Sequence, residues 1–141
     1  PTEGQSTLAD YRSLGLTLGR HPVDFLRPAL QARHFVSAAT LLKDYPDRRL
    51  ARACGMVTMR QRPQTAKGIV FVSLEDETGS VNVIVRPDLA ERQRTELTQA
   101  GLLGVYGVWQ RHQGTCHLVA SRLVDLSSLL GQLSIPSRNF H

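Results

Sequence analysis

Residues 67–87 read Lys-Gly-Ile-Val-Phe-Val-Ser-Leu-Glu-Asp-Glu-Thr-Gly-Ser-Val-Asn-Val-Ile-Val-Arg-Pro, and this stretch decides the fold. Two runs rich in valine flank an acidic turn that ends in Gly79, which predicts a β-hairpin with strands over residues 69–75 and 81–86. Because successive side chains of a strand point to opposite faces, one face of this hairpin is aliphatic throughout and must face the core. That core face holds Val70, Val72, Leu74, Val81, Val83 and Val85. The outer face then holds Phe71, Asn82, Ile84 and Arg86.

The segments around the hairpin predict three more strands and a helix. Residues 50–59 predict the first strand, in which Gly55 marks a bend, and residues 60–68 form a long loop after it. Pro87 begins a helix that extends to about Gln99, and a tight turn at Gln113-Gly114 joins two further strands over 102–111 and 115–124. This order predicts a mainly β protein, a five-stranded Greek-key barrel of the OB-fold type with a helix between strands 3 and 4. Such barrels bind single-stranded nucleic acid on the face of strands 2 and 3 and between two flanking loops.

The chain divides into three predicted parts: a helical linker segment over residues 1–47, the OB-fold domain over 48–126 and a C-terminal tail over 127–141. The first part begins with apolar residues at helical spacing, namely Leu8, Tyr11, Leu14 and Leu18. A second helix begins at Pro22, and Pro28 limits it to about two turns before a kink. Ser37 caps a third helix, which extends through Lys43. Since residue 1 is a proline, we expect the chain to be a piece of a longer protein.

Positive charge is concentrated where the first strand meets the following loop. The 141-residue chain has a formal net charge of +5, and residues 48–68 contain six basic residues and no acidic one. A local excess of this kind favours a polyanion through phosphate contacts and counterion release, whereas the alternative is a loop that is simply solvated. The candidate phosphate contacts are Arg60, Arg62, Lys67, Arg86 and Arg111.

Phe71 is the candidate stacking residue because it lies on the outer face of the second strand. A base stacked on such a ring contributes about 1–3 kcal/mol and requires no particular sequence. The alternative is that Phe71 packs under the N-terminal helices or a partner protein. Tyr106 and Trp109 alternate on the fourth strand, so that one of them points outward, and we expect the tryptophan in the core.

The sequence contains no recognisable catalytic arrangement. Its histidines are scattered, and the Walker and dinucleotide glycine patterns are absent. Cys54 and Cys116 lie in predicted strands and read as buried free thiols. No apolar run is long enough to span a membrane. We therefore expect a binding module with no catalytic residues and no metal or other cofactor of its own.

The acidic cluster Glu75-Asp76-Glu77 has two further interpretations. Clustered carboxylates can hold metal ions for nucleotidyl transfer, but consecutive acids at the end of a strand are more typical of a solvated turn in which Asp76 or Thr78 satisfies backbone donors. These acids would repel phosphate beside the outer face, and they fit contact with a basic protein partner.

Several motifs over nearly the whole chain resemble the C-terminal region of bacterial DNA polymerase III alpha-type subunits. The first set is Leu14-Gly15, His21-Pro22-Val23, the run from Arg52 to Val57 and Arg60-Gln-Arg-Pro63. The second set is Ala66-Lys-Gly68 with Phe71, Leu74-Glu-Asp-Glu-Thr-Gly79 and Val83-Ile-Val85. The ending, Leu123-Val-Asp-Leu126 and Ser137-Arg-Asn-Phe-His141, resembles the error-prone, damage-inducible branch of that family (ImuC).

This resemblance implies a parent polymerase with a nucleotidyltransferase core and magnesium ions elsewhere in its chain. It also implies translesion synthesis after DNA damage in the bacterial cytoplasm, together with an accessory Y-family-like protein (ImuB) and the sliding clamp. The OB-fold domain of such a polymerase would lie near the single-stranded template, with Phe71 and the loop over 60–68 as contact points. The alternatives are a protein-docking module for the accessory protein or the clamp, and a scaffold that only stabilises the parent. Gln132-Leu133-Ser134-Ile135 loosely resembles the start of a clamp-binding peptide.

Overall fold

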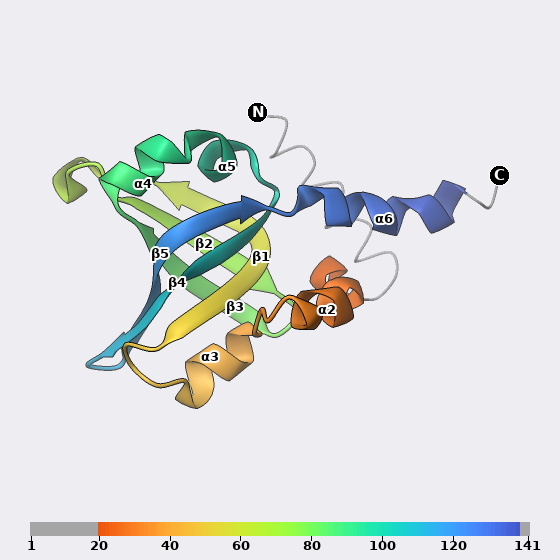
Figure 1. The fold of residues 1–141 in the computed structure, drawn as a ribbon, viewed down its shortest axis with the longest axis horizontal. Helices are drawn as coiled ribbons and strands as arrows, with labels where there is room; N and C mark the ends of the chain where they lie inside the picture. Colours follow the sequence, from red (N-terminus) through yellow and green to blue (C-terminus); the bar gives the residue numbers. More distant parts are fainter. Residues whose placement is uncertain (1–19, 139–141) are drawn as a thin grey trace.

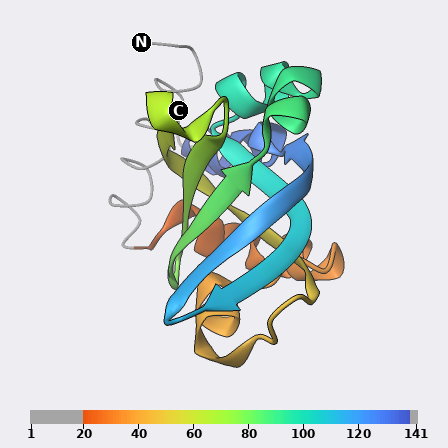
Figure 2. The same cartoon turned by 90° about the vertical axis from the view of Figure 1, so that its left-hand side faces the viewer.

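The computed structural model describes the backbone of residues 20–138 and the side chains of residues 20–133. Five strands close into one barrel: β1 (Leu50–Gln61), β2 (Val70–Asp76), β3 (Gly79–Val85), β4 (Leu102–His112) and β5 (Thr115–Asp125). Their order around the barrel is β1-β2-β3-β5-β4, and only the contact between β3 and β5 is parallel (Figures 1 and 2). The predicted five-stranded Greek-key barrel is therefore confirmed.

Helices lie at both ends and on one side of this barrel. The N-terminal part contains α2 (Pro22–Ala32) and α3 (Ala38–Asp44), and a 3₁₀ turn η1 (Gln64–Ala66) lies in the first loop. The predicted helix between strands 3 and 4 is present as two short helices, α4 (Pro87–Arg92) and α5 (Arg94–Gln99), and the tail forms α6 (Ser127–Arg138). The helix predicted over residues 8–18 lies outside the described residues.

The β2–β3 hairpin has the faces that its alternation predicts. All six residues assigned to the core face are buried, and Phe71 and Asn82 are exposed on the outer face. The Asp76 carboxylate accepts hydrogen bonds from the backbone N–H groups of Thr78 and Gly79 at 2.7 and 3.1 Å, which closes the turn as the sequence predicts. At the other hairpin, Gln113 and Gly114 have φ angles of 49° and 80°, the left-handed pair that a two-residue turn requires.

Two glycines allow the barrel to bend. A Cβ atom at Gly55 would lie 2.9 Å from the backbone of Glu75, and the pairing register of β1 against β2 shifts just after it, between Val57 and Met59. Gly107 lies at the register shift between β4 and β5, where a Cβ atom would meet the backbone of Val119. The bend predicted near Gly55 is therefore present.

The two mouths of the barrel are closed by different helices. Leu41 of α3 enters the core at one end, and Leu89 and Leu97 of α4 and α5 enter it at the other (Figure 1). Between these plugs lies Trp109, which is fully buried, as predicted. The opposed plugs make the barrel a closed, filled core.

A second core lies outside the barrel, against the outer face of β1 and β4. Leucines and Val23 of α2 pack there with Cys54, Met56 and leucines of α6. Helix α2 continues through Pro28 to Ala32, so the predicted limit of about two turns was wrong. Burial raises the pKa of the free Cys54 thiol to about 12. The chain divisions at residues 48 and 126 stay predictions, because α2, α3 and α6 all pack on the barrel.

No helix in the described part of the chain is long and apolar enough to cross a membrane.

Candidate nucleic-acid interface

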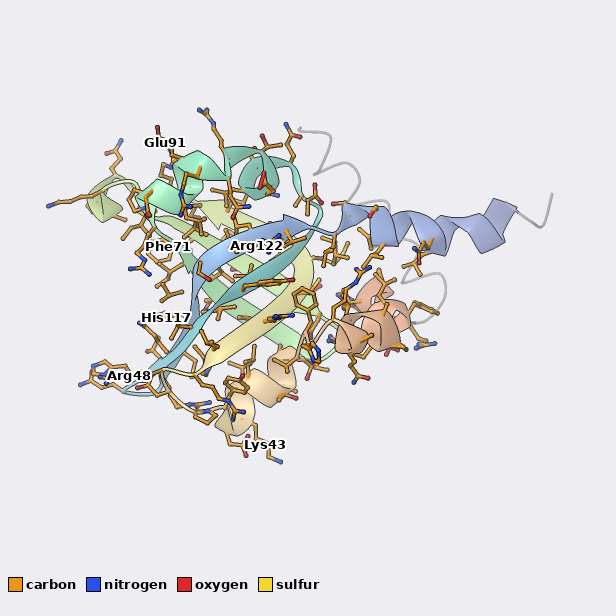
Figure 3. All side chains as sticks on the ribbon, in the orientation of Figure 1. Lys43, Arg48, Phe71, Glu91, His117 and Arg122 are labelled. Atoms are coloured by element: carbon orange, nitrogen blue, oxygen red, sulfur yellow. The ribbon has the colours of Figure 1, made fainter. Side chains whose placement is uncertain are left out.

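The outer face of β1, β2 and β3 carries two rows of side chains away from the covering helices. Strand pairing places Gln61, Phe71 and Ile84 in one row, and Met59, Ser73 and Asn82 in the next. Phe71 and Met59 are 37% and 50% exposed. Figure 3 shows Phe71 at the side of the barrel opposite α2 and α6. In the described part of the chain, Phe71 is therefore not packed under the N-terminal helices.

Three exposed cations beside this face come from two neighbouring segments. Arg62 and Lys67 lie at the two ends of the loop that contains η1, and Arg86 is the residue before α4. All three are exposed. Lys67 and Gly68 have φ angles of 51° and 89°, and this left-handed pair turns the chain back toward α4. A Cβ atom at Gly68 would lie 3.4 Å from the ring of Pro87, which places the loop beside Arg86.

A basic hollow of about 220 Å³ extends this cationic region around the mouth of the barrel. Its lining includes Arg60 and Arg62 of the first strand and loop, and Arg94 and Thr98 of α5. Sequence reasoning missed Arg94 because it treated residues 87–99 only as a core-plugging helix. The break between α4 and α5, which determines where Arg94 points, was not visible in the sequence. The break occurs at Gln93, whose side chain bonds both the N–H and the carbonyl of Leu123.

The guanidinium of Arg60 makes its hydrogen bonds to other parts of the protein. Strand β1 extends to Gln61, beyond its predicted end, and Arg60 pairs with the core residue Val72. Its guanidinium donates to the carbonyls of Leu97 and Ala100 at 2.6 and 2.5 Å, which caps the C-terminus of α5. Burial lowers the pKa of this guanidinium. A phosphate contact by Arg60 stays a prediction, with these two carbonyls as competitors.

Arg111 has the same kind of role at the opposite mouth. It lies on the Trp109 face of β4, two residues further along, and its guanidinium donates to the carbonyls of Leu41 and Tyr45 at 2.9 and 3.3 Å. These bonds cap the end of α3. Arg111 is therefore not brought together with Arg62, Lys67 and Arg86. The sequence could have indicated this, because residues 109 and 111 lie on the same face of a strand and Trp109 was expected in the core.

We predict that Arg60→Met lowers the free energy of unfolding by about 2 kcal/mol, because hydrogen bonds from charged donors contribute about 1.5–3 kcal/mol and this group is half-exposed. Urea unfolding measures this change. Arg62→Met is the matched control, since Arg62 is exposed and caps nothing; we expect its unfolding to be unchanged. If Arg60→Met unfolds like the wild type but weakens binding to single strands, the guanidinium serves the ligand and not the fold.

The acidic cluster at the end of β2 binds the N-terminal helices, so the prediction of a solvated turn was wrong for Asp76, which is buried. Arg27 of α2 donates to Glu77 at 2.7 and 2.8 Å and to Asp76 at 3.3 Å, and His21 lies 3.2 Å from Glu75. The bond to Arg27 holds the pKa of Glu77 below its usual range. Among the described residues, no three His, Cys, Asp or Glu side chains lie close enough to hold a metal ion. A docking role for this turn toward a basic partner loses its support, because its charges face α2.

The barrel matches a known family of protein domains. Residues 51–126, which cover the five strands except for Leu50 at the start of β1, match the family model described as the OB-fold nucleic acid binding domain. The chain belongs to this family. The OB-fold assignment from the residues alone is thus confirmed, and the matched range ends at the last residue before α6.

Several curated relatives of this OB-fold chain are named "Error-prone DNA polymerase". The chain is 67% identical to the protein of Bordetella parapertussis over 146 aligned residues, and 58% and 60% identical to those of Ralstonia nicotianae and Burkholderia mallei over 141. These alignments cover all of the chain but only 14%, 13% and 13% of the relatives. The chain thus spans about one-seventh of their length.

Solved structures show the same fold at low sequence identity. Asparaginyl-tRNA synthetase from Pyrococcus horikoshii matches 65% of the chain with a TM-score of 0.53 and 19% identity, over 23% of that protein. The protein ygiW from E. coli matches 65% of the chain with a TM-score of 0.51 and 11% identity, over 89% of its own length.

Proposed function

We propose that this OB-fold domain holds single-stranded template DNA for an error-prone DNA polymerase of the DNA polymerase III alpha type (ImuC branch). The parent would act in translesion synthesis, in the mutagenesis that follows DNA damage. Its catalytic core and magnesium ions would belong to the remaining length of the polymerase. We expect it to act in the bacterial cytoplasm, at the nucleoid.

One observation carries this proposal: an exposed phenyl ring stands on the outer face of the barrel with three exposed cations at one end of it. A ring on which bases stack, beside a positively charged track for the backbone, is the combination by which OB-folds bind single strands without sequence preference. The family match and the names of the relatives support a nucleic-acid ligand and a polymerase parent.

We predict that Phe71→Ala weakens binding of short oligothymidylate by about 1–2 kcal/mol, roughly 5- to 30-fold, since one base loses its stacking partner. Fluorescence anisotropy with a labelled strand of about 6 nucleotides measures the change. Phe71→Leu keeps the apolar volume without the aromatic face, and it should lose nearly as much.

Met59→Ala is the control for this experiment, because Met59 is more exposed than Phe71 but offers no ring. Its effect should stay below about 2-fold. Equal losses in Met59→Ala and Phe71→Ala would indicate general apolar contact and would contradict base stacking.

Protein docking remains the second candidate function, with the accessory ImuB-like protein or the sliding clamp as partner. It is favoured by Ile84 on the outer face. The acidic turn no longer supports it, and Leu133 of the clamp-like sequence packs at the edge of the second core. Retention of either partner on immobilised domain at micromolar concentration, lost on Ile84→Asp, would support docking. Retention of neither would exclude it.

A further inference from the structure

The outer row that contains Phe71 continues around the barrel beyond β3. Strand pairing places Ile84 opposite Phe71, Val119 beside Ile84, Val108 opposite Val119, and Leu50 opposite Val108. These residues form an apolar belt: Phe71, Ile84, Val119, Val108 and Leu50. The three in the middle are half-buried, and Leu50 is 75% exposed. The belt therefore crosses the strands in the order β2, β3, β5, β4 and β1, which is their order around the barrel (Figures 1 and 2).

At its far end the belt opens into a second hollow, of about 430 Å³, on the outer face of β1, β4 and β5. Two tyrosine rings, Tyr45 and Tyr106, line this hollow together with His34, Arg52 and Leu50. No aspartate or glutamate is among its lining residues. It is separate from the Phe71 face, because its lining residues come from β1, β4, β5 and the segments before β1, whereas Phe71 lies on β2.

Arginines are held on the tyrosine rings at this hollow. The guanidinium carbons of Arg52 and Arg122 lie 4.5 and 5.5 Å from the centre of the Tyr106 ring, and that of Arg49 lies 5.3 Å from the Tyr45 ring. Arg52 also donates to the carbonyl of Arg33 at 3.0 Å. Stacking on a ring fixes the plane of a guanidinium and leaves its edge N–H groups to bind a phosphate. In the described part of the chain, no ion pair joins these three arginines to a carboxylate.

We propose that this second hollow is an additional contact site for single-stranded nucleic acid, reached along the apolar belt from Phe71. Arg49, Arg52 and Arg122 bind backbone phosphates there, and bases cross the belt between the two sites. The inference rests on the proposed function and extends it to a longer strand. A docked protein is less well matched, because the belt is one side chain wide and ends among three cations.

The path length agrees with the reach of a short single strand. From β2 to the start of β1 the belt crosses four strand-to-strand steps of about 4.8 Å, so its length is on the order of 20 Å. Bound lengths for one OB-fold range from about 4 to about 16 nucleotides. We assign the Phe71 face alone to the lower end of that range, and both sites together to a strand several nucleotides longer.

The test compares oligothymidylates of about 4 and about 16 nucleotides on the wild type and on the triple variant Arg49→Gln, Arg52→Gln, Arg122→Gln. We expect unchanged affinity for the short strand and a loss of at least about 10-fold for the long one. The dependence of log affinity on log salt should fall by about 2 for the long strand only, since each phosphate contact on single strands contributes about 0.7. A long strand can bind in more positions than a short one, which raises its apparent affinity. Comparing variants at equal strand length removes this effect.

Two further variants keep the test decisive. Leu50→Glu places a negative charge at the rim of the hollow without removing a buried group, and it should reproduce the long-strand loss even if the triple variant is unstable. Arg20→Gln, Lys43→Gln, Arg92→Gln is the matched control, with the same change of charge on exposed residues of other segments, and it should bind long strands within about 2-fold of the wild type.

The outcomes separate the two proposals. Equal losses for short and long strands in the hollow variants, or no loss in either, would overturn the second site and leave the Phe71 site standing. If the short strand does not bind and Phe71→Ala has no effect, the proposed function fails. The second site then fails with it, because it extends the strand that is bound at Phe71.

Discussion

Replacing Arg62, Lys67 and Arg86 together by glutamine should lower the affinity for a short single strand about 100-fold at 0.1 M salt. Each phosphate contact on a single strand contributes about 0.7 to the slope of log affinity against log salt. Three contacts therefore contribute about 2 to the slope, which corresponds to about two decades between 1 M and 0.1 M salt. Titration of a labelled strand at four or five salt concentrations measures both quantities.

The control triple Arg20→Gln, Lys43→Gln, Arg92→Gln distinguishes this face from the general charge of the protein. It also removes three positive charges, but from residues outside the Phe71 face. We expect its slope to match that of the wild type. An equal fall of affinity in both triples would mean that the strand responds to net charge and not to these three residues.

The second large effect concerns stability: Asp76→Ala should lower the free energy of unfolding by about 3–5 kcal/mol. The Asp76 carboxylate is 6% exposed and accepts from the N–H of Ala38 at 2.8 Å and from Thr78 and Gly79 in the turn. It also lies 3.3 Å from the guanidinium of Arg27. Its removal leaves these donors and a partly buried cation without their acceptor, which costs more than a single hydrogen bond.

Urea unfolding of Asp76→Ala, Asp76→Asn and Glu77→Ala tests this explanation. Asp76→Asn retains one acceptor oxygen and should lose about half as much. Glu77→Ala removes the two hydrogen bonds from Arg27 but leaves the bonds of Asp76 in place, and we expect about 1.5–3 kcal/mol. A loss below about 1 kcal/mol in Asp76→Ala would show that the turn and α3 are held by packing alone.

The β2–β3 hairpin could be predicted from the sequence because its period-two pattern is unbroken. No bulge or buried charge interrupts Val70 to Leu74 or Val81 to Val85, so alternation alone assigned each side chain to its face. The closure of the turn by Asp76 was also predictable, since its bonds to Thr78 and Gly79 are local, whereas its bonds to Ala38 and Arg27 were not.

The directions of the Arg60 and Arg111 side chains were harder to predict. Both residues lie near the ends of strands, where the alternation that determines which face a side chain takes is difficult to follow. Arg60 follows a register shift in β1, so simple alternation from the start of the strand does not show which face it takes. Its hydrogen-bond acceptors, the carbonyls of Leu97 and Ala100, are also far away in sequence. Arg111 had a visible signal in Trp109, but the acceptors on α3 are far away in sequence. A count of cations in the sequence therefore overestimates those available to a ligand.

The partner of the acidic turn could not be predicted either. Arg27 lies about 50 residues before Glu77 in the chain, and nothing local to either residue indicates their ion pair. The same holds for the second hollow, since Tyr45, Arg52 and Tyr106 come together only through the closure of β1 on β4.

The packing of α2 against α6 has a consequence for how the barrel would be carried by a larger polypeptide. Both helices rest on the same flank, and Phe71 lies on the opposite one. Connections made through these helices would attach the domain by the flank opposite Phe71 and leave the Phe71 face uncovered. Template could then reach the open flank without any rearrangement of the attachment.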